Sequence, residues 1–182
     1  IVSVQNNDII TFTPHELDIN SVSISDAGDK AFTGSSDKTA VLWHTQTGKE
    51  IHSLAHQSRV NFVAMNNDAS LAFTLDAIRD RSFWLLKIGK AFAELNSNIK
   101  FIEFNDGQFS DDKQWFASAS PKQKLQLWQV KTGKLIGQWQ AFKLPERKRA
   151  SVIAIEFIED HRLATITSDG MYQVWPIIKE NL

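Results

Sequence analysis

The sequence contains no cysteine, so disulfide bonds, thiol catalysis and cysteine-ligated zinc are excluded for these 182 residues. No apolar run approaches the about 20 residues that a membrane-spanning helix needs. The net charge is only −1, which gives no general attraction to nucleic acid or to an anionic membrane. What remains is a chain of ordinary apolar content, 42%, that carries six tryptophans.

Four of the tryptophans mark an internal repeat. Trp43, Trp84, Trp128 and Trp175 are separated by 41, 44 and 47 residues. Five residues after each of the first three comes a glycine followed by a lysine, at Gly48-Lys49, Gly89-Lys90 and Gly133-Lys134. Matches at fixed offsets with this period indicate an array of similar structural units.

Each unit has the pattern of strands rather than helices. In the first unit Val22 and Ile24 alternate with serines, as a half-buried strand should. Turn residues at 26–29, 37 and 47–48 separate further strands at 31–35, up to Trp43, and at 50–54. Four short strands in about 42 residues form one blade of a β-propeller.

The expected organisation is all-β, with about four blades of four antiparallel strands. Residues 1–14, with strands at 1–4 and 9–12, are predicted to end a preceding blade. Three full blades follow at 15–54, 55–95 and 96–139, and the last blade is 140–182. The last blade has three clear strands, because Pro176 cannot donate to a sheet ladder and begins a fourth only weakly.

Four residues of the first full unit carry a family resemblance. His15 precedes the first strand, Thr33 lies on the second, Asp37 follows in the turn, and Trp43 comes six residues after Asp37. This set resembles the WD40-repeat family, and the resemblance covers nearly the whole chain. It implies a buried hydrogen-bond chain through these four side chains that ties the blade together.

The later units keep parts of the same set. These are His56, Thr74 and Trp84 in the second unit, Ser118 and Trp128 in the third, and Thr165, Asp169 and Trp175 in the fourth. Ile78 and Lys122 stand where the aspartate belongs in the second and third units, and Asp80 comes two residues late. Ala141 stands at the histidine's offset in the fourth unit.

The resemblance also implies a number of blades. Family propellers mostly have seven, which takes about 300 residues at this repeat length. We therefore expect the C-terminal part of a longer chain, whose end blades are covered by the remaining blades of its own propeller or by a dimer mate. The alternative is a closed four-bladed ring, in which the strand at 9–12 completes the last blade.

No coherent catalytic or metal-binding set emerges. His15, Thr33 and Asp37 could be misread as a nucleophilic triad, but no oxyanion-hole motif accompanies them and the blade-stabilising role explains them together with Trp43. The five histidines lack metal-ligand spacing. We expect no enzyme activity, no cofactor and no metal.

The most distinctive surface segment is 143–149, which carries Lys143, Arg147, Lys148 and Arg149 and a single acid. In WD40 proteins the loop that enters a blade lies on the face that meets partners, so this segment is a candidate site for an acidic peptide or a phosphate group. The alternative is a solvated loop. Other residues expected at that face are Asp18, Asn20, Ser36, Arg59, Asn61, Glu103, Asn105, Ser151 and Ser168.

The leading functional hypothesis is a non-catalytic scaffold that binds a protein or peptide through the propeller face. One alternative is an enzyme or ligand-binding propeller that uses a central channel, and a second is nucleic-acid association through the basic 143–149 loop. The incomplete sets and the lack of cysteine are similar to bacterial WD40 proteins of Gram-negative species, some of them envelope lipoproteins. That likeness implies a soluble domain in the periplasm or envelope, with the cytoplasm as the alternative.

Overall fold

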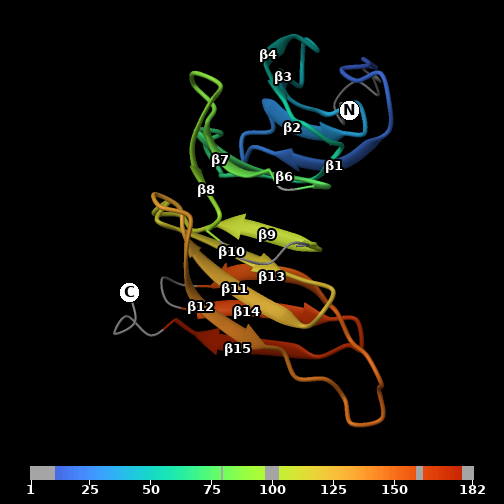
Figure 1. Cartoon of the computed structure of the whole chain (residues 1–182), viewed down its shortest axis with the longest axis vertical. Helices are drawn as coiled ribbons and strands as arrows, with labels where there is room; N and C mark the ends of the chain where they lie inside the picture. Colours follow the sequence, from blue (N-terminus) through green and yellow to red (C-terminus); the bar gives the residue numbers. More distant parts are fainter. Residues whose placement is uncertain (1–10, 79, 97–102, 159–161, 178–182) are drawn as a thin grey trace. The chain divides into compact units, whose positions relative to one another are not determined.

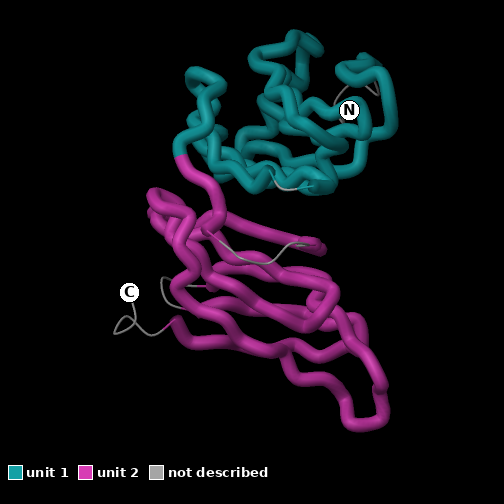
Figure 2. The backbone as a smooth tube through the Cα atoms, viewed as in Figure 1, with its two compact units in different colours: residues 1–92 teal, residues 93–182 magenta. Residues whose placement is uncertain are grey.

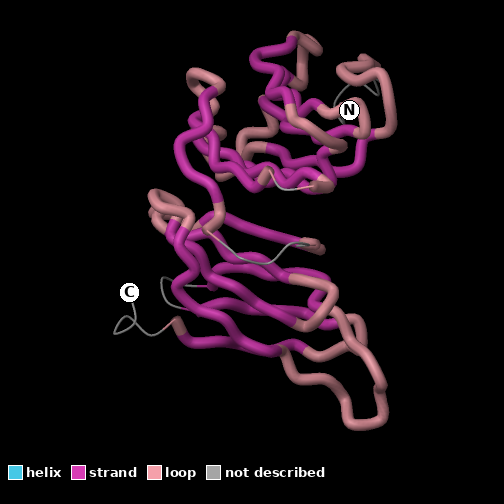
Figure 3. Tube along the Cα trace, viewed as in Figure 1, coloured by secondary structure: helices cyan, strands magenta, loops and turns pink. Residues whose placement is uncertain are grey.

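The computed structural model describes residues 11–78, 80–96, 103–158 and 162–177, which form strands, turns and loops (Figures 1 and 3). In these ranges no helix is long and apolar enough to cross a membrane. The predicted strand at 1–4 and most of the one at 9–12 fall outside the described residues. The all-β fold class predicted from the repeat is confirmed.

The first two sheets are antiparallel and each runs through its four strands in chain order. The first contains β1 (Ile19–Ile24), β2 (Lys30–Ser35), β3 (Thr39–His44) and β4 (Glu50–Ala55). The second contains β5 (Val60–Met65), β6 (Leu71–Asp76), β7 (Arg81–Leu85) and β8 (Lys90–Glu94). Each sheet is one short meander, as a propeller blade requires.

The last two sheets follow the same order. The third contains β9 (Asp106–Phe109), β10 (Trp115–Ala119), β11 (Lys124–Gln129) and β12 (Lys134–Gln140). The fourth contains β13 (Val152–Ile158), β14 (Arg162–Thr167) and β15 (Tyr172–Pro176), and it has three strands among the described residues. The blade boundaries and the size of the complete ring stay predictions.

The chain divides into two compact units, Ile1–Phe92 and Ala93–Leu182 (Figure 2). Each unit contains one complete contact between consecutive sheets. In the first unit β1 and β2 lie beside β5, and in the second unit β9 and β10 lie beside β13. We call the face of a sheet that meets the next sheet its downstream face, and the opposite one its upstream face.

The recurring glycines lie in the turns between the third and fourth strands. Gly48, Gly89 and Gly133 have φ angles of 66°, 59° and 67°. This is the left-handed region, which costs other residues about 1–2 kcal/mol. The Gly-Lys repeat is therefore explained by one backbone conformation used three times.

The predicted alternation of β1 is present, and its polar face is the one that meets the neighbouring sheet. Val22 and Ile24 are 59% and 58% exposed. The serines face β5 instead, where the Ser21 Oγ accepts the backbone N–H of Val63 at 3.1 Å and the Ser23 Oγ accepts that of Met65 at 3.0 Å. The alternation is real, but the face that contacts the neighbouring sheet is the polar one, because its hydroxyls serve the backbone of β5.

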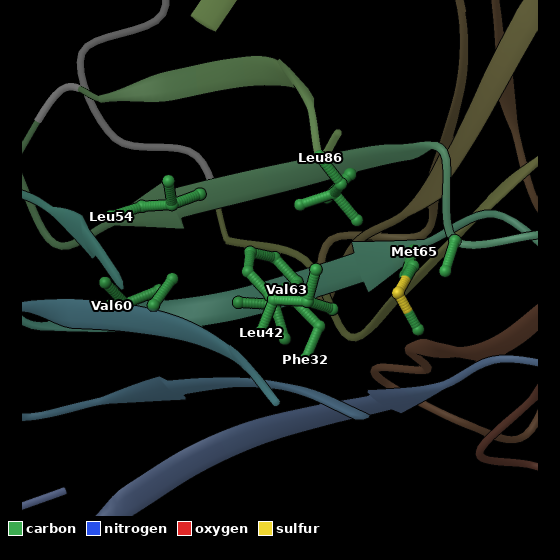
Figure 4. Close-up of a cluster of buried hydrophobic side chains, with 10 residues drawn as sticks. Phe32, Leu42, Leu54, Val60, Val63, Met65 and Leu86 are labelled. Carbon is green, nitrogen blue, oxygen red and sulfur yellow. The ribbon is translucent and has the colours of Figure 1, made fainter. Parts of the chain in front are cut away.

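The core of the first unit lies between its two sheets (Figure 4). Phe32, Leu42 and Leu54 from the downstream face of the first sheet pack against Val63 and Leu86 from the second. Phe32 is fully buried, and burying a side chain of this kind contributes about 1.5–3 kcal/mol. The contact between the sheets is thus the main apolar stabilisation of the unit.

The second unit repeats this core with different side chains. Ala117 and Leu127 from the third sheet pack against Val152, Ile155 and Leu163 from the fourth. Trp115, Trp139, Phe157 and Trp175 line the edge of the cluster. The small side chain of Ala117 on the downstream face of the third sheet is thus compensated by the large aromatic side chains around the cluster, which keep the junction filled.

Hydrogen bonds cross both junctions at equivalent places. The Asn20 amide donates to the carbonyl of Val60 at 2.9 Å, and the Asn105 amide donates to that of Val152 at 2.8 Å. The Asp106 carboxylate accepts the backbone N–H of Ile155 at 2.9 Å, as Ser21 does for Val63 in the first unit. These side chains fix the register of one sheet on the next.

We expect Gly133→Ala to destabilise the second unit more than Gly170→Ala. Both glycines have positive φ, at 67° and 89°. A Cβ at Gly133 would lie 1.7 Å from the carbonyl oxygen of Glu94, whereas one at Gly170 would have no atom within 4 Å. Gly170→Ala should cost about 1–2 kcal/mol from backbone strain alone. Urea unfolding measures both, and equal losses would contradict the predicted backbone clash.

Candidate functional site

The four residues that carry the family resemblance form a continuous hydrogen-bond chain in the first sheet. The Trp43 indole N–H donates to the Thr33 hydroxyl at 3.3 Å, and that hydroxyl lies 2.7 Å from the His15 Nε2. The His15 Nδ1 lies 2.9 Å from the Asp37 Oδ2. One proton order satisfies every link, with the Thr33 hydroxyl donating to His15 and His15 donating to Asp37.

Asp37 is held ionised by its surroundings. Burial by itself would raise its pKa, but hydrogen bonds from the Thr39 hydroxyl, from the backbone N–H groups of Glu16 and Thr39, and from His15 lower the pKa to about 2. The Thr39 hydroxyl donates at 2.6 Å and the Glu16 N–H at 3.1 Å. The carboxylate thus joins the segment before β1 to the β2–β3 turn.

The second sheet builds the same kind of chain from a different aspartate. The Trp84 indole donates to the Thr74 hydroxyl at 2.8 Å, and the His56 Nδ1 lies 2.9 Å from the Asp80 Oδ2. Ile78, at the aligned aspartate position, is 54% exposed. Asp80 also accepts the Ser82 hydroxyl. Burial opposes ionisation of Asp80, but the bonds from His56 and Ser82 lower its pKa.

One link is missing in this second chain. The His56 Nε2 is buried and has no hydrogen-bond partner among the described residues, whereas the equivalent atom of His15 meets Thr33. The sequence spacing alone could not show that Asp80 reaches His56. Asp80 lies two residues after the position that aligns with Asp37, and only the path of the backbone in the turn brings its carboxylate to the histidine.

The third and fourth sheets keep only the tryptophan link. Trp128 donates to the Ser118 hydroxyl at 3.0 Å, and Trp175 donates to the Thr165 hydroxyl at 3.0 Å. Lys122, which stands at the aspartate position of the third unit, is exposed and has no carboxylate with which to extend the chain. The roles assigned to these residues stay predictions, although each tryptophan N–H has an acceptor of the expected type.

In the fourth sheet Asp169 serves a different partner. Its Oδ2 accepts the backbone N–H of Leu144 at 2.7 Å, and its Oδ1 accepts the Thr167 hydroxyl. These bonds, the one from Thr167 first, lower its pKa, and the charge of Arg147 adds to the effect. Asp169 therefore anchors the β12–β13 loop in place of a histidine.

The base of the β12–β13 loop is attached to β15 as well. The Phe142 backbone N–H donates to the Gln173 Oε1 and the Gln173 Nε2 donates to the Phe142 carbonyl, each at 2.9 Å. The Phe142 ring stacks on Trp175, with centroids 5.8 Å apart and planes 13° apart. Sequence reasoning missed Phe142 and Gln173, because nothing in their spacing indicates that they meet.

Figure 1 shows the path of the long loop between β12 and β13, which carries the basic residues. Lys143, Arg147, Lys148 and Arg149 are all exposed. The loop is folded on itself, since the Arg147 N–H donates to the Leu144 carbonyl at 3.0 Å and the Lys143 Nζ donates to the Arg147 carbonyl at 2.6 Å. The result is a basic surface on an anchored support.

Of the other candidate binding residues in the first unit, some form hydrogen bonds within the unit and some are exposed. Asn20 donates to the Ser36 hydroxyl at 3.1 Å as well as to Val60, so its amide works within the unit. Asp18 accepts the Ser36 backbone N–H through its carbonyl and keeps an exposed side chain. Arg59 and Asn61 are exposed.

In the second unit Glu103 is exposed and the Asn105 amide is used by Val152. The Ser151 backbone N–H donates to the Ser168 hydroxyl at 3.0 Å, and the Ser151 hydroxyl donates to the carbonyl of Pro121 at 3.0 Å. The basic residues of the loop thus share their exposure with Asp18, Arg59, Asn61 and Glu103, but they are the ones grouped on a single segment. No group of three metal-ligating side chains occurs within the described ranges.

The family model for the WD domain, G-beta repeat, matches residues 6–44, the segment that contains the complete His15–Trp43 chain. The chain is a WD40-repeat protein. It is 23% identical over 176 residues to Pre-mRNA-processing factor 19 homolog 2 of Arabidopsis thaliana, covering 93% of this chain and 32% of that protein. It is 24% identical over 173 residues to the Serine-threonine kinase receptor-associated protein of Dictyostelium discoideum, covering 94% of this chain and 56% of that protein.

A solved structure has a similar fold. The structure of U3-55K superposes with a TM-score of 0.73 at 16% identity, covering 93% of this chain and 52% of that one. This WD40-repeat chain thus spans about a third to just over a half of the relatives and the structure that it matches. At this identity the likeness concerns the fold.

We expect Thr33→Val to destabilise the first unit more than Thr74→Val. Loss of the Thr33 hydroxyl leaves two buried groups, the Trp43 N–H and the His15 ring nitrogen, without a partner, and each such loss costs about 1–3 kcal/mol. Thr74 serves the Trp84 N–H but not the His56 Nε2. Urea unfolding compares the two variants, and a larger loss at Thr74 would contradict the assigned bonds.

The contribution of Asp37 to stability should depend on pH. Its pKa is about 2 in the folded protein against 3.8 unfolded, so ionisation favours the folded state above pH 3.8. This stabilisation is lost as the pH falls through the folded pKa. The difference in unfolding free energy between the wild type and Asp37→Asn should therefore be constant near neutrality and shrink below about pH 4. An increase of this free-energy difference below pH 4 would contradict a lowered pKa of Asp37 in the folded protein.

Proposed function

We propose that this WD40-repeat protein is a non-catalytic scaffold that binds an acidic segment of a partner protein through the β12–β13 loop. The observation that carries the proposal is the anchoring of that loop. Its base is tied to Asp169 and Gln173 and stacked on Trp175, while four basic side chains face solvent. A preorganised basic surface loses less entropy on binding than a free loop does.

The charges fit a carboxylate or phosphate ligand. Arg147 and Arg149 can each bind a carboxylate with two parallel hydrogen bonds, and Lys143 and Lys148 add point charges. The exposed face of the Phe142 ring, 67% of whose residue surface is open, offers an apolar contact beside them. An acidic peptide with an occasional apolar residue matches this combination.

The names of the similar proteins are consistent with a role in protein interaction. One is named a pre-mRNA-processing factor, and the other is named for its association with a serine-threonine kinase receptor. The relatives named are eukaryotic, so the likeness to bacterial envelope proteins stays a prediction, and so does the compartment. The partner of this chain is proposed here only by its chemistry.

The test is direct binding of a fluorescent peptide of alternating glutamate and serine. Reversing two loop charges in Arg147→Glu/Arg149→Glu should weaken binding by about tenfold or more, mainly by removing charge-assisted bonds. The matched control is Lys87→Glu/Lys131→Glu, which changes the net charge equally at exposed turn residues outside the loop. Equal loss in both variants would show a general charge effect and would refute the loop.

Nucleic-acid binding by the same loop is the second candidate. It would give a steep decrease of affinity with salt and a preference for single-stranded DNA over the acidic peptide at equal charge. The net charge of the whole chain, −1, does not favour nucleic-acid binding.

An enzyme that uses the central channel is the remaining alternative. It is tested by metal analysis of the purified protein, where a stoichiometric metal would support it.

A further inference from the structure

The basic run of the β12–β13 loop is followed closely by a serine. Arg147, Lys148 and Arg149 precede Ala150 and Ser151. Ser151 is the one serine or threonine of the sequence that has a lysine or arginine at both the second and the third position before it. One class of protein kinase selects its substrate serines by such charge patterns, because its own acidic side chains bind the basic residues. The sequence around Ser151 is therefore a candidate site of phosphorylation.

The basic residues that a kinase would recognise lie outside the sheets. Residues 141–151, all of them described, form no strand and connect β12 to β13. The side chains of Arg147, Lys148 and Arg149 are exposed. Surface loops are where binding and modification concentrate, because their backbone is not paired in a sheet. These three cations can thus enter the acidic groove of a kinase while both flanking strands stay paired.

Ser151 itself is half-buried and is held by hydrogen bonds just before β13. Its backbone N–H donates to the Ser168 hydroxyl at 3.0 Å, and its carbonyl accepts the Ser168 backbone N–H at 2.8 Å. Its hydroxyl donates to the Pro121 carbonyl at 3.0 Å. The next residue, Val152, is buried and begins the strand. Chain segments at the ends of strands open locally at a lower free energy than core strands do, so opening these bonds exposes the hydroxyl while the rest of β13 stays paired.

The surroundings of Ser151 suit a phosphate group. A phosphoserine carries a charge of about −1.5 to −2 at neutral pH and mainly accepts hydrogen bonds, so it cannot keep the contact with the Pro121 carbonyl and turns toward cations. Lys122 directly follows Pro121, Arg149 lies two residues before Ser151, and both are exposed. Lys122 stands where the first unit has Asp37, whose carboxylate would repel a phosphate. The unusual lysine thus makes this turn basic where it meets Ser151.

A phosphate on Ser151 would change the charge of the loop. Segment 143–149 has four basic residues and one acid, which gives it a net charge of +3. The phosphate lies two residues beyond this segment, and its charge of about −1.5 to −2 reduces the net charge of the loop to about +1 to +1.5. Exposed charges act on one another over about 8–10 Å at physiological salt, so the phosphate weakens the attraction of the neighbouring arginines for an acidic ligand.

We propose that Ser151 is phosphorylated by a protein kinase that selects basic residues, and that its phosphate weakens the binding of acidic segments by the β12–β13 loop. The second part rests on the proposed function. In the reaction the Ser151 Oγ forms a bond to the γ-phosphorus of ATP, the bond from that phosphorus to the bridging oxygen breaks and releases ADP, and the hydroxyl proton passes to a carboxylate of the kinase. The same basic residues first recruit the kinase and are then neutralised by its product.

The site is tested on the intact chain with ATP and the catalytic subunit of cyclic-AMP-dependent protein kinase, which belongs to this class. We expect the intact mass to increase by one phosphoryl group, which tandem mass spectrometry of the peptides should locate at Ser151. Ser151→Ala should abolish this increase. Ser168 is an internal control, because it is exposed but has no basic residue at either recognition position, and it should stay unmodified. A chain that takes up no phosphate at Ser151 excludes the site.

Recognition through the basic run is tested by two matched variants. Lys148→Ala/Arg149→Ala removes the cations at the two recognition positions and should lower the initial rate of phosphorylation by about tenfold or more. Lys87→Ala/Lys131→Ala removes the same charge at exposed turn residues outside the loop and should leave the rate unchanged. Equal rates in the two variants would contradict recognition through this run. All four positions are exposed, and unchanged tryptophan fluorescence would show that both variants fold.

The effect on binding is measured with the purified phosphorylated chain and the fluorescent peptide of alternating glutamate and serine. The phosphorylated chain should bind this peptide about tenfold more weakly than the unmodified chain, and removal of the phosphate by a phosphatase should restore the affinity. Unchanged affinity of the phosphorylated chain would overturn the effect on binding. Failure of the unmodified chain to bind the peptide would refute the proposed function, whereas binding by a chain that the kinase does not modify at Ser151 would refute only the present inference.

Discussion

The structure depends on the burial of one sheet against the next. A single meander of four short strands has two faces and too little interior of its own, so it cannot be stable by itself. Phe32 and Leu42 become buried only because β5 lies over them, and Ala117 and Leu127 only because β13 does. These two junctions hold the main apolar clusters of the two units.

The tryptophan hydrogen bonds lie within each sheet. The indole N–H groups of Trp43, Trp84, Trp128 and Trp175 each donate to a serine or threonine on the neighbouring strand, so each has an acceptor. The histidine and aspartate extend this link to the loop above the strand. In the fourth sheet, which has no such histidine, Asp169 and Gln173 bond directly to the backbone of the loop after β12.

The junctions also use polar side chains. The amides of Asn20 and Asn105 belong to the scaffold, because they fix one sheet on the next, although by sequence they resemble surface residues. The basic side chains of the β12–β13 loop lie outside these junctions and are exposed.

The sequence by itself determined the repeat, the all-β class and the identity of the residues that bond to each tryptophan. These depend on local properties, namely turn glycines with positive φ, strand alternation and fixed offsets between donors and acceptors, so they are readable without coordinates. The His15–Trp43 chain is an example, since all four residues lie within one sheet and its entering segment.

Only the tertiary structure decided which face of each strand is buried and which polar groups are used. Alternation in β1 has the same period whichever face is inward, and the choice fell on Ser21 and Ser23 because β5 offers them backbone N–H groups. Asp80 replaced Ile78 at His56, and Gln173 met Phe142, through the paths of turns and loops. Such contacts join residues far apart in sequence, and no local pattern encodes them.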